Sequence, residues 1–209
     1  MRFQRCLPVV CFLTVCLLAG GSYTGAGEED ENHSSLGDSL KDGKFKIDLR
    51  YRWENVDDDG VPADGDASTL RTAVSYRSGL FYNFKATFQL EHVADIGANS
   101  KHNNIGAGSL ANGVMGRPVI ADPEITEVNQ AFLEYHAPGG TTLAAGRQEF
   151  KLADQRFFGT VGWRQNHQSF EAFRVNVKNI PKTTVTYAFL NRSNRINGGE
   201  WEQESHVLD

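Results

Sequence analysis

Residues 44–56 read Lys-Phe-Lys-Ile-Asp-Leu-Arg-Tyr-Arg-Trp-Glu-Asn-Val, and this stretch decides the fold class. Apolar and polar residues alternate one by one, which is the period of a β-strand with one apolar and one polar face. An amphipathic helix would instead place its apolar residues three and four positions apart. The apolar side ends in Tyr51 and Trp53, and the other side is strongly charged. This pattern is typical of transmembrane barrel strands, with aromatic residues at the membrane interface, and also of soluble β-sandwich strands.

The first 26 residues predict a secretory signal peptide. Arg2 and Arg5 precede an apolar run over residues 7–19, and small residues follow up to Ala26, where we expect cleavage. The run is too short for a membrane helix, and no later segment approaches the ~20 apolar residues that such a helix needs. A membrane-spanning fold would therefore have to be a barrel.

The cysteines and the charge balance exclude several classes of function. The three cysteines all lie in the leader, at Cys6, Cys11 and Cys16. We therefore expect the mature chain to have no disulfide, no zinc–cysteine site and no cysteine nucleophile. Removing the leader takes away two of the 21 basic residues and none of the 26 acidic ones, which leaves 19 against 26, or −7. A chain this acidic is not expected to bind nucleic acid, because it has no basic stripe to displace phosphate counterions.

The remaining chain divides into a lead-in and a series of alternating segments. Residues 27–43 are polar and acidic without periodicity, and predict a mobile periplasmic lead-in. Two-residue alternation predicts seven strands, at residues 44–56, 69–76, 83–91, 127–135, 141–148, 170–177 and 183–190. Residues 191–209 are polar and are not assigned to a strand.

The connections between these strands alternate between long and short. They are long after Val56, Glu91 and Gln148, and short near residues 78–79, 138–140 and 179–182. Antiparallel outer-membrane barrels have short periplasmic turns and long extracellular loops, whereas a sandwich has no such constraint. The sequence therefore predicts an all-β fold, with an antiparallel transmembrane β-barrel over residues 44–209.

The strand number indicates that this barrel is incomplete. Seven is odd, whereas bacterial single-chain barrels close with an even number, and a sheet with bare edges cannot lie in hydrocarbon. The odd strand number has three possible explanations: a further strand brings the number to eight, another subunit completes the sheet, or the chain is the N-terminal part of a longer barrel. We favour the third.

Cationic residues are frequent on the faces predicted to be polar. They are Lys46, Arg50, Arg52, Arg71, Arg77, Lys85 and Arg174. Arg and Lys lining a pore favour anions through charge and through hydrogen bonds to carboxylates. The alternative is that they pair with Asp48, Glu54, Glu91 and Glu134 and brace the wall.

Other motifs are weaker. The acidic loop fits a calcium template in part, with Asn55, Asp57 and Asp59 at positions one, three and five and Asp66 at position twelve. Strands on either side and Pro62 in the middle make a solvated loop the better interpretation. The sequence has no Gly-x-Ser-x-Gly elbow, phosphate-binding glycine pattern or paired metal-ligating histidines, so we expect no enzymatic activity, no cofactor and no metal.

Four segments resemble the bacterial alginate-export family of outer-membrane porins. They cover residues 40–43, 121–131, 146–148 and 155–166, and the last, Gln-Arg-Phe-Phe-Gly-Thr-Val-Gly-Trp-Arg-Gln-Asn, is the most specific. The resemblance implies a monomeric barrel with a positively charged constriction that passes an anionic polysaccharide such as alginate out of the cell. It also implies Arg147, Arg156 and Arg164 as candidates for the pore wall or for a loop folded into the pore. Barrels of that family have many more strands than this chain supplies.

Two functional hypotheses follow. The first is a porin-like channel in the outer membrane, surrounded by lipid, which passes anionic or small hydrophilic solutes by diffusion and is a monomer if the barrel is complete. The second is a secreted soluble β-domain that binds or degrades polysaccharide. They differ in whether the apolar strand faces contact lipid or a second layer of protein.

Overall fold

The computed structural model describes residues 9–19, 31–97, 101–152, 155–156 and 158–209. The chain is nearly all β. Its long strands are β1 (Val9–Ala19), β3 (Lys44–Val56), β4 (Gly65–Arg77), β6 (Phe84–Asp95), β7 (Ile125–Ala137), β8 (Thr141–Gln148), β9 (Ser169–Ile180), β10 (Thr183–Asn194) and β11 (Glu200–Leu208). Short elements are β2 (Asn32–His33), α1 (Leu36–Lys41), β5 (Leu80–Phe81) and the 3₁₀ turn η1 (Gly108–Leu110).

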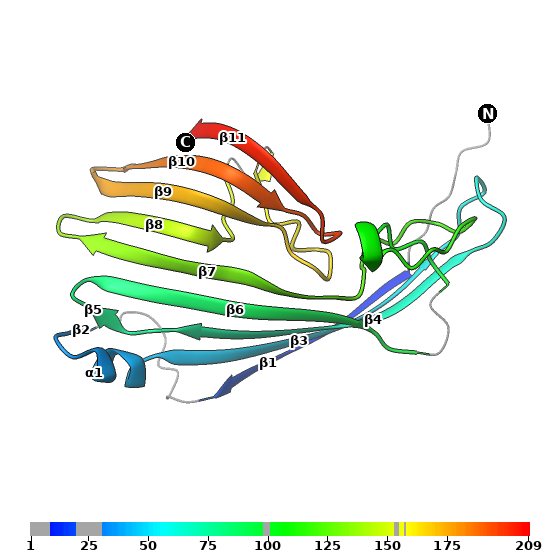
Figure 1. Cartoon of the computed structure of the whole chain (residues 1–209), viewed down its shortest axis with the longest axis horizontal. Coiled ribbons are helices and arrows are strands. Elements are labelled where there is room, and N and C mark those ends of the chain that lie inside the picture. The colour runs from blue at the N-terminus through cyan, green and yellow to red at the C-terminus, as the bar shows by residue number, and fades with distance from the viewer. Residues whose placement is uncertain (1–8, 20–30, 98–100, 153–154, 157) are drawn as a thin grey trace.

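The long strands form one antiparallel sheet in the order β1-β3-β4-β6-β7-β8-β9-β10-β11 (Figure 1). From β3 onward each long strand pairs with the next long strand in the chain. The predicted antiparallel fold is thereby confirmed. Within the described residues β1 and β11 are the edges of the sheet, so this chain forms an open portion of a barrel wall.

All seven predicted strands are present, and β3 and β8 have the predicted bounds. β11 was not predicted, because residues 191–209 are mostly polar and show no clear alternation of apolar and polar residues. Residues 9–19 of the predicted signal peptide form β1, which pairs with β3 from Ala19 opposite Phe45 to Val9 opposite Asn55. The expected cleavage after Ala26 lies outside the described residues.

The two ends of the sheet differ in their connections. The short turns at residues 138–140 and 181–182 lie at the end where α1, β2 and β5 gather, on the left in Figure 1, and the long connections lie at the other end. In the predicted Pro138-Gly139-Gly140 turn, both glycines have positive φ, +82° and +83°, which a residue with a side chain rarely adopts. The seventh connection, residues 195–199, is short although it lies at the long-loop end.

The two faces of the sheet have the opposite polarity to that of a soluble protein. Large apolar residues on one face are exposed, with Phe45 53%, Phe88 47% and Val74 38% accessible. On the other face charged residues are buried, with Glu91 0%, Arg71 4% and Lys85 4% accessible. We call these the outward and the inward face. Buried side chains of soluble proteins are mainly apolar, so this distribution is unusual and shows that no layer of the described residues covers the outward face.

A small apolar cluster lies on the inward face of β9 and β10. Its members are Phe150, Leu152, Phe170, Ala172, Ala188 and Leu190. The rings of Phe150 and Phe170 lie with their centroids 5.0 Å apart. The cluster fixes the start of the β8–β9 connection, residues 149–168, against the inside of the sheet.

The prediction of a mobile lead-in is wrong for residues 32–43, while residues 27–30 lie outside the described part. β2 pairs with β5, and the Ser39 hydroxyl donates to the Gly79 carbonyl at 2.9 Å. These contacts fasten α1 to the turn between β4 and β6. Nowhere in the described ranges does a helix have the length and apolar character needed to cross a membrane.

Candidate functional site

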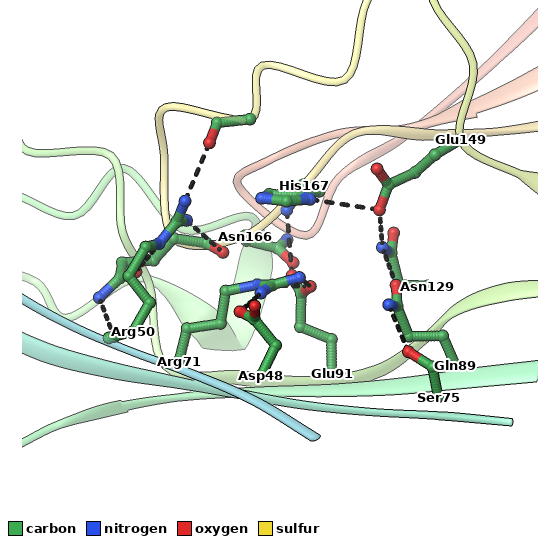
Figure 2. A network of polar contacts seen from close by, with 12 residues as sticks. Asp48, Arg50, Arg71, Ser75, Gln89, Glu91, Asn129, Glu149, Asn166 and His167 are labelled. Carbon is green, nitrogen blue, oxygen red and sulfur yellow. Dashed lines mark hydrogen bonds and ion pairs between the residues drawn. The ribbon is translucent and has the colours of Figure 1, made fainter. Parts of the chain in front are cut away.

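The inward face of β3, β4 and β6 carries a buried ion-pair cluster. Arg50 and Arg71 lie directly opposite each other on β3 and β4, an arrangement of like charges that is unfavourable unless other partners separate them. Arg71 turns toward carboxylates, with Nη1 2.8 Å from Asp48 and Nε 2.7 Å from Glu91 (Figure 2). Arg50 turns the other way, toward the loop of residues 149–168.

That loop folds inward across the sheet. Arg50 donates to the Gly162 carbonyl at 2.9 Å and to the Gln165 side-chain oxygen at 2.8 Å, and also to the Arg164 carbonyl. Arg52 donates to the Trp163 carbonyl at 2.9 Å. The loop connects β8 to β9 yet contacts β3, and β4, β6 and β7 lie between. The sheet must therefore curl so that its inward face surrounds the loop.

Gln165 is the central residue of this contact and is fully buried. Its side-chain amide donates to the Thr69 hydroxyl at 2.9 Å and to the Thr69 and Arg50 carbonyls at 3.0 and 3.2 Å. Its backbone amide donates to Asp122 at 2.9 Å. Asp122 and Gln165 come from two of the family-like segments, which the fold thus brings together.

A second group of charges surrounds the loop tip. Arg52 contacts Glu54 and lies 3.4 Å from Asp122. Arg164 lies 3.3 Å from Glu54 and 3.7 Å from Asp122. Burial lowers the pKa of Arg164 below its usual value, and the attraction of Asp122 and Glu54 opposes this shift. Arg164 is in this way part of the inward-folded loop that its family-like segment implied, and it braces the loop against the wall.

The base of the loop is held by Glu149. It accepts a hydrogen bond from Asn129 and lies 3.2 Å from the His167 ring (Figure 2). Burial alone would raise the pKa of Glu149, but the hydrogen bonds and charge interaction with His167 and the bond from Asn129 outweigh it, so the pKa is lowered. His167 also donates its backbone amide to Glu91 at 3.0 Å, which joins the loop base to the Arg71 cluster.

Asn129 reaches this position because of a β-bulge. Gln89 pairs with Gln130 and Leu90 pairs with Val128, so Asn129 is an extra residue in β7. A bulge redirects a side chain that regular alternation would turn to the other face. It also explains why the alternation over residues 127–135 is less regular than in the other strands.

A cavity of about 360 Å³ lies between the loop base and the inward wall. Its lining includes Lys46, Arg50, Ser75 and Gln130, together with Asp48, Arg71, Gln89, Glu149 and His167. Lys46 forms no ion pair or hydrogen bond within the described part of the chain, and Arg50 contacts only neutral acceptors. The cavity is therefore polar, and its lining includes two cations that no carboxylate contacts directly.

The other predicted cations have different roles. Arg77 lies 3.1 Å from Glu134, and Arg174 lies over the Phe150 ring at 5.4 Å. Lys85 is buried on the same face. The four carboxylates named in the bracing alternative, Asp48, Glu54, Glu91 and Glu134, each contact an arginine. Arg52, Arg71 and Arg77 therefore pair with carboxylates of the wall, whereas Lys46, Arg50 and Arg174 form no ion pair with a carboxylate in the described part of the chain.

Two residues implied by the resemblance lie away from the loop contact. Arg147 opposes Ala131 on the outward face, where it lies 2.7 Å from Glu171 and donates to the Val128 carbonyl at 2.8 Å. Arg147 therefore does not line the inward face. Arg156 is exposed.

The calcium template is not assembled. Asn55 and Asp66 oppose each other across β3 and β4, and the Asn55 amide donates to the Gly65 carbonyl at 3.2 Å. Asp57 and Asp59 are exposed. In the described ranges no three His, Cys, Asp or Glu side chains gather as a metal site would require.

Gln165, Asp122, Asn129, Glu149 and His167 were not predicted as site residues. Asp122 and Gln165 fall within family-like segments, which is a usable signal. Asn129 also falls within such a segment, but Glu149 and His167 lie outside all four, and a bulge and a loop crossing bring the three residues together.

Comparison with known proteins identifies one family. The sequence profile described as alginate export matches residues 42–194, which includes the wall, the inward-folded loop and β10. Neither the curated proteins nor the solved structures contain a match to the chain.

Proposed function

This chain belongs to the alginate-export family, a family of outer-membrane transport proteins, and on that premise we propose that it forms part of an outer-membrane porin-like channel. Anionic or small hydrophilic solutes pass along its inward face by diffusion, without covalent chemistry. An anionic polysaccharide such as alginate is the proposed exported solute.

The reversed polarity of the two sheet faces is the observation that carries the proposal. Exposed Phe45, Val74 and Phe88 suit contact with acyl chains, and the buried ion pairs suit the wall of a water-filled lumen. A soluble polysaccharide-binding domain would have to cover the same apolar face with protein, and the described residues provide no such layer.

The inward-folded loop provides the constriction. The loop narrows the lumen beside Arg50 and leaves the polar cavity between the loop base and the inward wall. Lys46 lines this cavity on the side of the short turns. Cations without a carboxylate in contact attract an anionic solute, whereas paired ones add little net charge. The proposed selectivity thus depends on Lys46 and Arg50 more than on the whole set of basic residues.

Conductance across a planar lipid bilayer tests this proposal. With its open sheet closed into a barrel by a second copy or by further strands, the purified chain is expected to conduct with a preference for chloride over potassium, and Lys46→Glu is expected to reduce that preference. Lys182→Glu is the matched control, because it makes the same charge change in the exposed β9–β10 turn. A chain that fractionates as a soluble protein and does not conduct would overturn the proposal, and an unchanged preference in Lys46→Glu would overturn the assignment of the cation.

A further inference from the structure

We propose that α1 is a membrane-interface anchor, whose Leu36 and Leu40 side chains insert among the acyl chains of the periplasmic leaflet of the outer membrane. The inference rests on the proposed outer-membrane location and adds a lipid contact to it. The partner is a phospholipid surface.

The faces of α1 divide according to helix geometry. Residues 36 and 40 lie one turn apart on the same side of an α-helix. Both are exposed, Leu36 at 56% and Leu40 at 49%. Ser39 is buried against the β4–β6 turn, where its hydroxyl donates to the Gly79 carbonyl and the Gly79 amide donates to its carbonyl, both at 2.9 Å. The helix is thus fastened by one side and presents two leucines on another.

The backbone of α1 is bonded to a residue of the outward apolar face. Tyr76 lies on that face of β4, and its hydroxyl donates to the Leu40 carbonyl at 2.7 Å. The Tyr76 ring also packs against Phe45 of β3, with centroids 4.7 Å apart. Aromatic residues at the end of an apolar strand face mark the membrane interface in transmembrane barrels. α1 therefore lies at the level of that boundary, at the short-turn end of the sheet (Figure 1).

The link between α1 and β3 is short and closely packed. A Cβ added at Gly43 would overlap the Tyr76 hydroxyl, so this position holds only glycine without rearrangement. This close approach keeps the helix against the outer edge of the wall. Lys41 in the last turn and Asp38 in the first are on the side away from the leucines, where headgroups and water would meet them.

Other possible occupants of this surface are a periplasmic protein and a second copy of the chain. The contact of α1 with Tyr76 on the exposed apolar strand face favours lipid, because the same phase would cover the strand face and the exposed leucines. Short amphipathic segments bind membranes in this orientation, with the apolar side at the acyl boundary.

Single-cysteine labelling tests the anchor on the full chain. The three leader cysteines are first replaced by serine, so that an introduced thiol is the only one whether or not the leader is removed. Leu36→Cys, Leu40→Cys, Asp38→Cys and Phe88→Cys are each labelled with a polarity-sensitive fluorophore. The labelled chains are placed in phosphatidylethanolamine–phosphatidylglycerol vesicles. Quenching is then measured with nitroxide-bearing lipid and with iodide in the water.

The labels at positions 36 and 40 are expected to be quenched by the lipid-borne nitroxide and to lose most of their accessibility to iodide. The label at position 38, on the opposite side of the same helix, is expected to remain accessible to iodide. Equal iodide quenching at positions 36, 38 and 40, with lipid quenching retained at position 88, overturns the anchor and leaves the channel proposal standing. Absence of lipid quenching at position 88 overturns the outer-membrane location and the anchor with it.

Discussion

The inward and outward faces of the sheet hold their ion pairs in different surroundings. On the inward face Arg71 has two carboxylate partners, Asp48 and Glu91, and its side chain is 5% accessible. On the outward edge Arg192 also has two, Glu200 and Glu202, but its side chain is 31% accessible. Both arginines thus have two carboxylate partners, but they differ in their exposure to solvent. Burial, more than the number of ion pairs, therefore decides which charges stabilise this wall.

The largest expected effect is a difference in the free energy of unfolding between the alanine variants of these two arginines. Arg71→Ala leaves Glu91 buried without its partner, and loss of one member of a buried pair typically costs about 3–5 kcal/mol. Arg192→Ala at the exposed site is expected to cost about 0–1 kcal/mol. Urea unfolding in lipid vesicles measures both free energies, and equal costs would refute the comparison.

A smaller effect tests which face meets lipid. Val74 and Ser75 are neighbours on β4, and they point outward and into the cavity respectively. Val74→Arg is expected to lower the free energy of unfolding, by at most the roughly 2–4 kcal/mol that an arginine costs on the lipid face at the midplane, because Val74 lies two residues from Tyr76 at the interface.

Ser75→Arg is the matched control for this change. It places the same charge in the polar cavity and removes only one hydrogen bond, the one that Gln89 donates at 2.8 Å, which is worth about 1 kcal/mol. Heat-modifiability on a gel and urea unfolding compare the two variants. A greater loss in Ser75→Arg than in Val74→Arg would show that the faces had been assigned the wrong way round.

The smallest expected effect is the pH dependence of the loop base. The pKa of Glu149 is lower in the folded chain than in the unfolded one. Its contribution to stability is therefore fully present above the unfolded pKa, about 4.3, and is lost as the pH falls through the folded pKa. We expect loop 149–168 to become more sensitive to protease as the pH falls below this value.

Glu149→Gln is expected to remove most of this acid dependence, because a neutral amide does not titrate. Glu204→Gln, at an exposed position on β11, is the control and is expected to leave the dependence unchanged. Limited proteolysis between pH 7 and pH 3, with a protease active over that range, measures the effect. An unaltered profile in Glu149→Gln would assign the acid response to another group.

Much of the wall was predictable because its strands alternate strictly. The run over residues 44–56 gave the bounds of β3 and both of its faces, since a two-residue period assigns each side chain to a face. β11 was not predictable in this way, because Glu200, Glu202 and Glu204 alternate with residues that are themselves mostly polar. Its strand conformation comes from pairing with β10.

The antiparallel strands, their inward and outward faces and the alternation of long and short connections follow from the amino-acid sequence alone. Each of these features is set by residues that are close together in the sequence, because the strand period assigns each side chain to a face and local turn residues end each strand. Only the tertiary structure decided which cations are neutralised and where loop 149–168 lies. Arg50 meets Gln165, and Glu54 meets Arg164, across more than a hundred residues of chain, so no local period encodes these contacts. They exist because the curled sheet brings β3 to face the loop that follows β8.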